Sequence, residues 1–169
     1  MATTFDDGDC YQDLVCPSGQ DCIITTTVKQ CWQGYTIDAS AATNLFITAT
    51  EEKEAFKLAT INLPNTGDAT LTQSGSSTKA FREAIITAGT NTQNIIIDCA
   101  DSDTANYDDC KSIQVDAQTA QYLEVNFPNG GSRSDANNDP SNFWCPVGSL
   151  YNGPEKAPCV INLSGTVNI

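Results

Sequence analysis

The sequence predicts an all-β fold, a single β-solenoid (parallel β-helix) of about six rungs of roughly 23–28 residues. Two observations predict it. Short segments that alternate apolar and polar residues recur along the chain, as strands with one buried face require, and they form two series with a shared period. The first series is 13–17, 36–39, 60–64, 85–88, 114–117 and 143–146, and the second is 22–25, 45–48, 69–72, 95–98, 123–126 and 159–162.

The strands of both series should build the interior of the coil. Rungs stack about 4.8 Å apart, so each strand pairs with its equivalents above and below and satisfies their backbone groups. The inward side chains should then stand in single file. The second series predicts a column of Ile24, Ile47, Leu71, Ile97, Val125 and Ile161, and the first predicts a column of Leu14, Ile37, Ile61, Ile86, Val115 and Phe143.

The residues that open the rungs predict a third column, which should line a corner. Residues 51–58 have a helix-like composition, but we expect a charged corner loop there, before the third rung. Residues 1–9 lack the alternating pattern, so they are assigned to an N-terminal tail and residues 10–169 to the solenoid domain. The predicted corner column is Cys10, Cys31, Ala55, Ala80 and Cys110.

The composition excludes several classes of partner. The 169 residues contain 8 Lys+Arg against 21 Asp+Glu, a formal net charge of −13, and no histidine. Nucleic acids and anionic lipids attract basic surfaces, so an acidic chain is a poor partner for either. The chain has no apolar run of about 18 residues, and we therefore expect no membrane insertion.

The eight cysteines predict disulfides rather than a metal site, since the chain has no Cys-x-x-Cys pair and no histidine. The repeat register pairs cysteines that flank one turn or open consecutive rungs. Local bridges of this kind stabilise the folded state by about 2–4 kcal/mol each, and they predict an oxidising, extracellular location. The expected pairs are Cys10–Cys31, Cys16–Cys22, Cys99–Cys110 and Cys145–Cys159.

The cysteine-containing rungs resemble the cysteine-rich, short-rung β-solenoid repeats of secreted and cell-surface proteins of protists, stramenopiles among them. The shared phrase is a Cys-Pro turn followed by Cys-[Ile/Val]-Ile and then Ser-Gly. Residues 16–24 match its first part, and residues 145–165 match all of it. The inner rungs depart from it, with Leu, Ala and Ile in place of the cysteines. The resemblance implies an extracellular structural or adhesive role, including components of surface filaments such as flagellar hairs (mastigonemes), and it transfers no catalytic residues.

The two ends of the coil are the first candidate site. Terminal rungs expose strand edges unless they are capped, and the sequence shows no amphipathic capping helix. Head-to-tail stacking of such ends makes a fibre, so the expected partners are copies of the chain or related solenoid subunits. The alternative is a piece of a longer solenoid, since residues 165–169 resemble the start of a seventh rung. The interface residues expected are Asp9, Tyr11, Thr166, Val167 and Ile169, with Arg133 in a long polar loop.

A threonine face is the second candidate. Outward threonines of three successive rungs should form a flat grid, the pattern of a surface that binds a glycan or, as the weaker alternative, ice. The grid ends at Asp98, in the fourth rung, and exposed β-branched residues are common on strands. The residues are Thr25, Thr48, Thr72, Thr27 and Thr50.

The remaining motifs give weaker indications of function. Asn162 begins an Asn-Leu-Ser sequon, so it is a candidate glycosylation site. Acidic loops could offer oxygen ligands to Ca²⁺, but none has the spacing of a defined calcium loop, and solubilising surface charge is the favoured interpretation; no cofactor is expected. Asp38, Asp98 and Asp116 are too scattered for a pair of catalytic carboxylates, so we do not expect an enzyme.

Overall fold

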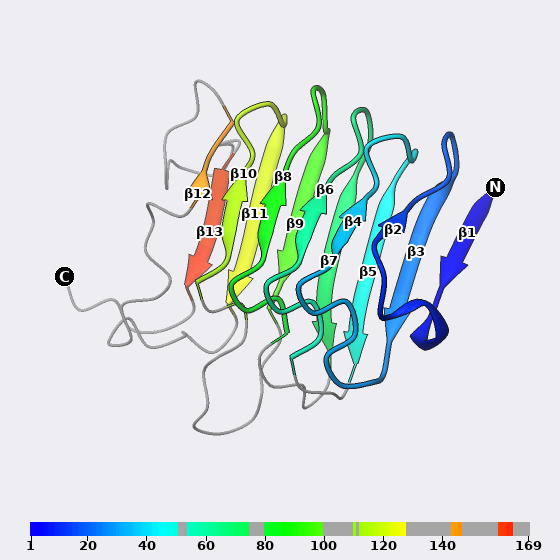
Figure 1. Cartoon of the computed structure of the whole chain (residues 1–169). Helices are drawn as coiled ribbons and strands as arrows, with labels where there is room; N and C mark the ends of the chain where they lie inside the picture. The colour runs from blue at the N-terminus through cyan, green and yellow to red at the C-terminus, as the bar shows by residue number, and fades with distance from the viewer. Residues whose placement is uncertain are drawn as a thin grey trace.

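The chain forms a β-solenoid of two parallel sheets that lie face to face around one core, as the sequence predicts (Figure 1). The computed structural model describes residues 1–50, 54–74, 80–99, 110, 112–127, 143–146 and 159–163. Within them the one helix is a 3₁₀ turn, η1 (Asp7–Asp9). Nearly all regular structure is therefore strand.

The strands alternate between the two sheets along the chain, so each passage through both sheets makes one rung. Every pairing between neighbouring strands is parallel. The larger sheet contains β1 (Ala2–Phe5), β3 (Asp21–Thr26), β5 (Leu45–Thr50), β7 (Ala69–Ser74), β9 (Asn94–Asp98), β11 (Tyr122–Phe127) and β13 (Cys159–Leu163), in that order. The smaller sheet contains β2 (Leu14–Val15), β4 (Thr36–Asp38), β6 (Thr60–Asn62), β8 (Ile85–Thr87), β10 (Gln114–Asp116) and β12 (Phe143–Trp144).

The predicted inward columns are confirmed. Strand register places the middle residues of β3, β5, β7, β9, β11 and β13 directly opposite one another, and all are at most 7 % exposed. Because each rung buries its apolar side chains on those of the next, the core is one continuous cluster along the axis. The column is Ile24, Ile47, Leu71, Ile97, Val125 and Ile161.

The corners between the larger and smaller sheets use left-handed backbone at regular positions. Residues equivalent in successive rungs have positive φ, a conformation that costs a non-glycine residue about 1–3 kcal/mol. Backbone hydrogen bonds between rungs stabilise this left-handed conformation. The Phe56 N–H donates to the Cys31 carbonyl (2.8 Å), and the Phe81 N–H donates to the Ala55 carbonyl (3.0 Å). The two sets are Trp32, Phe56, Phe81 and Cys110 (φ 51, 56, 53 and 48) and Gly34, Leu58, Glu83 and Ser112 (φ 74, 59, 58 and 56).

The corner at residues 54–58 is a series of turns, which agrees with the loop expected there. The third predicted column needs one correction. Cys110 N–H donates to the Ala80 carbonyl (2.9 Å), the same bond that Phe81 makes to Ala55, so Cys110 stacks above Phe81 and not above Ala80. The longer connection before this rung shifts the cysteine by one position, where it is buried and bonded to Cys99.

All four predicted disulfides are confirmed. Cys10 and Cys31 join consecutive rungs, and their Cα atoms lie 4.7 Å apart, the spacing of stacked residues. The structure contains no free cysteine. Four disulfides indicate an oxidising environment. The described part of the chain contains no helix with the length and apolar character that a membrane crossing requires.

The N-terminal residues are not a tail, contrary to the expectation for residues 1–9. β1 is the first strand of the larger sheet and pairs with β3, with Thr3 opposite Cys22 and Phe5 opposite Ile24. η1 then leads into the first rung. The alternating pattern was too weak to predict this strand because Phe5 is its one large apolar residue facing the core.

Candidate functional site: the N-terminal edge and the outer face of the larger sheet

β1 is an edge strand, and its outer edge has no strand partner within the described residues. The Met1 carbonyl accepts a hydrogen bond from the Asp21 N–H (3.1 Å), so this residue faces β3. Backbone groups of alternate residues in a strand point to opposite edges. Thr3 and Phe5 therefore also face β3, and the backbone groups of Ala2 and Thr4 face away from it.

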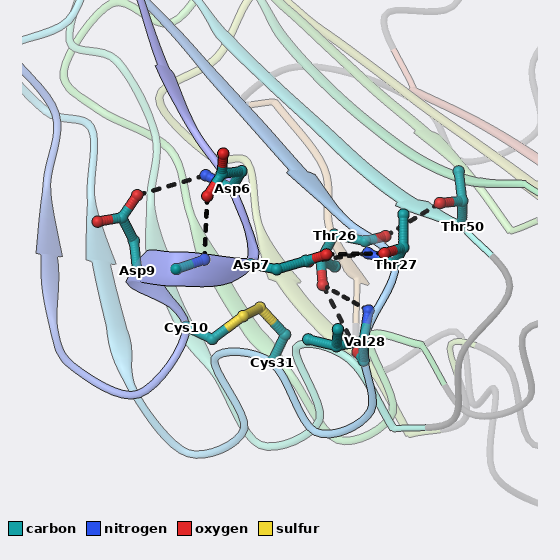
Figure 2. The surroundings of a disulfide bond; sticks show 10 residues. Asp6, Asp7, Asp9, Cys10, Thr26, Thr27, Val28, Cys31 and Thr50 are labelled. Carbon is teal, nitrogen blue, oxygen red and sulfur yellow. Dashed lines mark hydrogen bonds between the residues drawn. A yellow bond between two sulfur atoms is a disulfide. The ribbon is translucent and has the colours of Figure 1, made fainter.

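At the N-terminal end of the solenoid, the side chains of Asp7 and Asp13 accept hydrogen bonds that backbone carbonyls accept in later rungs. The Thr27 backbone N–H and hydroxyl donate to the two carboxylate oxygens of Asp7 (3.0 and 2.7 Å; Figure 2). The Thr36 N–H donates to Oδ1 of Asp13 (2.8 Å). One rung later, the equivalent N–H, that of Thr60, donates to the backbone carbonyl of Tyr35 (3.1 Å). The carboxylates thus satisfy donors that the first rung would otherwise leave open.

The ionisation of Asp7 reflects these bonds. Partial burial raises the pKa of its carboxyl, but the hydrogen bonds from Thr27 and weaker ones from Thr26 and Val28 outweigh burial, so the pKa lies below its ordinary value. The group is near the surface, and the effect on stability is correspondingly modest.

η1 carries the remaining acidic groups at this end. The Gly8 N–H donates to Oδ1 of Asp6 (2.9 Å), and the Asp6 N–H donates to Oδ2 of Asp9 (3.4 Å), a reciprocal capping box (Figure 2). Asp9, one of the expected interface residues, therefore has a local structural role. Tyr11, the next, is 65 % exposed. Thr166, Val167, Ile169 and Arg133, the other expected interface residues, lie outside the described residues.

One group of three potential metal ligands is found in the described part of the chain: Asp7, Cys10 and Cys31. Both cysteines are joined in a disulfide, so neither offers the thiolate that binds a metal (Figure 2). This group therefore does not fit a metal centre. Of the three acidic loops considered for Ca²⁺, residues 6–9 form the capping box of η1, and residues 101–109 and 135–139 lie outside the described residues.

The threonine face exists as a column on the outer side of the larger sheet. Thr25, Thr48 and Thr72 stand opposite one another on β3, β5 and β7, and Asp98 follows on β9. No described residue bonds the hydroxyls of these three threonines. The second expected column differs, because the Thr27 hydroxyl donates to Asp7 and the Thr50 hydroxyl donates to the Thr26 carbonyl (3.1 Å; Figure 2). The grid therefore offers one row of unpaired hydroxyls instead of two.

A second outer column, which sequence reasoning missed, alternates carboxylates and amides. Oδ1 of Asp21 accepts from the Asn44 side chain (2.7 Å), and Oδ1 of Asp68 accepts from the Asn94 side chain (2.8 Å). The Asp68 N–H in turn donates to the Asn44 side-chain oxygen (3.0 Å). Alternation keeps carboxylates from stacking directly. The signal in the sequence is an Asp or Asn immediately before each of the first four strands of the second series.

The column ends at Tyr122, opposite Asn94. The Tyr122 hydroxyl donates to Glu124 (2.7 Å), and burial together with this bond and the Glu124 charge raises the pKa of Tyr122 to about 12. Both side chains lie on the outer side of β11.

The remaining candidates lie apart. Asp38 and Asp116 lie on β4 and β10, separated by two strands of the smaller sheet, and each accepts a hydrogen bond from its own turn. Asp98 is on the larger sheet and accepts from Asn126 (2.7 Å). The structure thus brings no two of these carboxylates together. Asn162 lies in β13, at the register position opposite Asn126.

Comparisons with protein-family models, with curated proteins and with solved structures give no match for this chain.

Proposed function

We propose that the protein is an extracellular structural module whose subunits join through their strand edges, end to end, into a filament or onto one. The observation that carries this proposal is the open edge of β1, on which no strand of the described residues pairs. An open edge strand is a template for another strand. Because the larger sheet is parallel throughout, a strand from a second subunit could extend it without a change of geometry.

The core supports the same proposal, since it is incomplete at this end. Phe5 is partly buried against Ile24, its partner in register, while the inward residues of the middle rungs are fully buried. Leu14, the first inward residue of the smaller sheet, is 6 % exposed. A rung added above β1 would cover the apolar surface that Phe5 exposes, with a gain of about 25 cal/mol for each Å² removed from water.

The proposed location follows from the disulfides. Four bridges staple a chain of 169 residues, including both of its outermost rungs. Such bridges persist outside the cytosol, so we place the protein in the secreted or cell-surface compartment. Glycosylation of Asn162 would fit this location, and it is tested by a shift in mass after treatment with peptide N-glycosidase.

Electron microscopy and sedimentation of the purified protein test the function, with Thr4→Pro as the informative variant. The Thr4 N–H faces the open edge, so proline there removes a donor to the incoming strand and leaves the β1–β3 bonds in place. Loss of one bond raises the concentration needed for assembly by about tenfold. Thr4→Val is the matched control, because it keeps the N–H and should assemble as the wild type does.

Dispersed monomers of wild-type protein at all concentrations would contradict the proposal. A glycan array would then decide for the second candidate, an adhesin that uses the outer face of Thr25, Thr48 and Thr72. The observation that favours this candidate is the uncharged column of threonine hydroxyls, to which no described residue bonds. The ice-binding alternative loses support, since Thr27 and Thr50 use their hydroxyls within the molecule.

A further inference from the structure

We propose that the strand which pairs with β1 is β13 of a second copy of this chain, in the single register that sets Phe5 on Ile161. This inference rests on the proposed function and names its partner strand and its register. It depends on two features of the described ends: the inward column that they share and the inward side chains that they leave uncovered.

The two ends belong to one column. Phe5 faces Ile24 in β3, and Ile161 faces Val125 in β11, so both residues occupy the inward file that runs through every strand of the larger sheet. Among the described strands, β1 and β13 are the outermost of that sheet. If a second copy lies end to end with the first along the solenoid axis, its β1 pairs with β13 of the first copy and continues the parallel sheet. The same arrangement places Leu14 of β2 above Phe143 of β12.

The alternation of side chains selects the register. Phe5 and Ile161 point inward, while Thr4 is exposed and Val160 lies on the outer side. A slip of one residue would set the inward Phe5 opposite Val160, which lies on the outer side of β13, so the Phe5 ring would lose the apolar contact that buries it. The register with Phe5 on Ile161 instead puts Thr4 above Val160 and Thr3 above Cys159.

The uncovered apolar side chains favour the same register over a slip of two residues. A slip of two residues toward the start of β13 would set Phe5 opposite Cys159, so the inward side chain of Ile161 would lose its apolar partner in β1.

Disulfide trapping between two variants tests the register. Stacked residues of consecutive rungs can form a disulfide, as Cys10 and Cys31 do with Cα atoms 4.7 Å apart. Protein with Thr4→Cys is mixed with protein with Val160→Cys under mild oxidation, and peptide mass spectrometry identifies the crosslink. Both sites are on the surface, so neither substitution disturbs the core. We expect a covalent dimer joined by these two cysteines.

The controls are matched by face and by position. Thr4→Cys mixed with Ile161→Cys pairs an outward residue with an inward one, and this mixture should give no crosslink. Ala2→Cys mixed with Val160→Cys would be crosslinked if β1 slipped two residues toward the end of β13, with Phe5 opposite Leu163, and a dimer there would overturn the inference. Filaments of the wild-type protein without a Thr4–Val160 crosslink would also overturn it, and would leave the proposed function standing. Absence of filaments and of crosslinks would overturn both.

Discussion

At the scale of single residues, Asp7 and Asp13 are the most informative positions of the N-terminal end. In most of the solenoid, the N–H groups of one rung donate to backbone carbonyls of the previous rung, but at Thr27 and Thr36 side-chain carboxylates accept these bonds instead. Asp7 accepts hydrogen bonds from Thr27, and Asp13 accepts one from Thr36, so two side chains satisfy N–H groups that have no backbone carbonyl to bond. These bonds involve Thr27 and Thr36 and not the backbone groups of β1 that face outward, so the outer edge of β1 stays open. Neither role is visible in the sequence, where both aspartates look like surface charge.

The Asp7 bonds predict an acid-sensitive contribution to stability. The pKa of Asp7 is lowered in the folded protein, so its contribution is fully present above the unfolded value of about 3.9 and is lost as the pH falls through the folded value. Asp7→Ala removes both acceptors and should lower the free energy of unfolding by about 1 kcal/mol at pH 6. Urea unfolding of the two proteins at pH 6 and pH 2.5 measures the difference.

Asp7→Asn is the control for charge. It keeps one acceptor for the Thr27 N–H, so it should be less destabilised than Asp7→Ala at pH 6. The gap between wild type and Asp7→Ala should be smaller at pH 2.5 than at pH 6, because the Asp7 carboxyl becomes protonated as the pH falls. A gap of the same size at both pH values would show that the Asp7 carboxylate does not carry the effect.

At the scale of elements, the strands were predictable and the corners were not. Alternation with a period of two marks a half-buried strand, and the recurrence of that pattern fixed the file from Ile24 to Ile161. A corner has no such period. Its left-handed residues, among them Phe56 and Leu58, owe their conformation to bonds with neighbouring rungs, which local propensity does not contain. The same limit explains Cys110, whose position depends on a connection of different length.

The corners also bury an aromatic ladder that sequence reasoning missed. Trp32 stacks on Phe56 and Phe56 stacks on Phe81, with ring centroids 5.4 and 5.2 Å apart and each ring fully buried. The indole Nε1 of Trp32 is buried and has no hydrogen-bond partner among the residues that the structure describes, so packing outweighs that cost here. The signal was present, because each ring directly follows a small or cysteine residue of the corner column, namely Cys31, Ala55 and Ala80.

Phe56 sits between two rings, and its truncation should therefore be severe. Phe56→Ala removes a fully buried ring and both stacking contacts, so we expect a loss of about 3–5 kcal/mol in the free energy of unfolding. Phe46→Ala is the matched control: Phe46 lies in β5 on the outer side and is 38 % exposed, so its loss should be much smaller. Denaturant unfolding compares the two. Equal losses would mean that neither the burial nor the stacking of the Phe56 ring adds to stability beyond what the half-exposed Phe46 ring contributes.

At the scale of the whole molecule, two features oppose each other in the proposed assembly. The parallel sheets offer edges that invite another subunit, while every copy carries a net charge of −13. Like-charged copies repel, and this repulsion helps to keep an open edge from indiscriminate pairing. Assembly should therefore occur where salt screens the charge, and the register proposed for β1 and β13 decides how the subunits then meet.

The balance predicts a direction for the salt dependence of assembly. The Debye length falls from about 30 Å at 0.01 M salt to about 8 Å at 0.15 M, so repulsion between copies weakens over this range. We expect the concentration of protein needed for filaments to fall as sodium chloride is raised, measured by sedimentation with microscopy of the pellet. Thr4→Pro should need more protein than the wild type at every salt concentration, because screening does not restore the missing donor. Filaments that dissolve as salt is raised would instead mean that opposite charges hold the subunits together, and the open-edge account of assembly would fail.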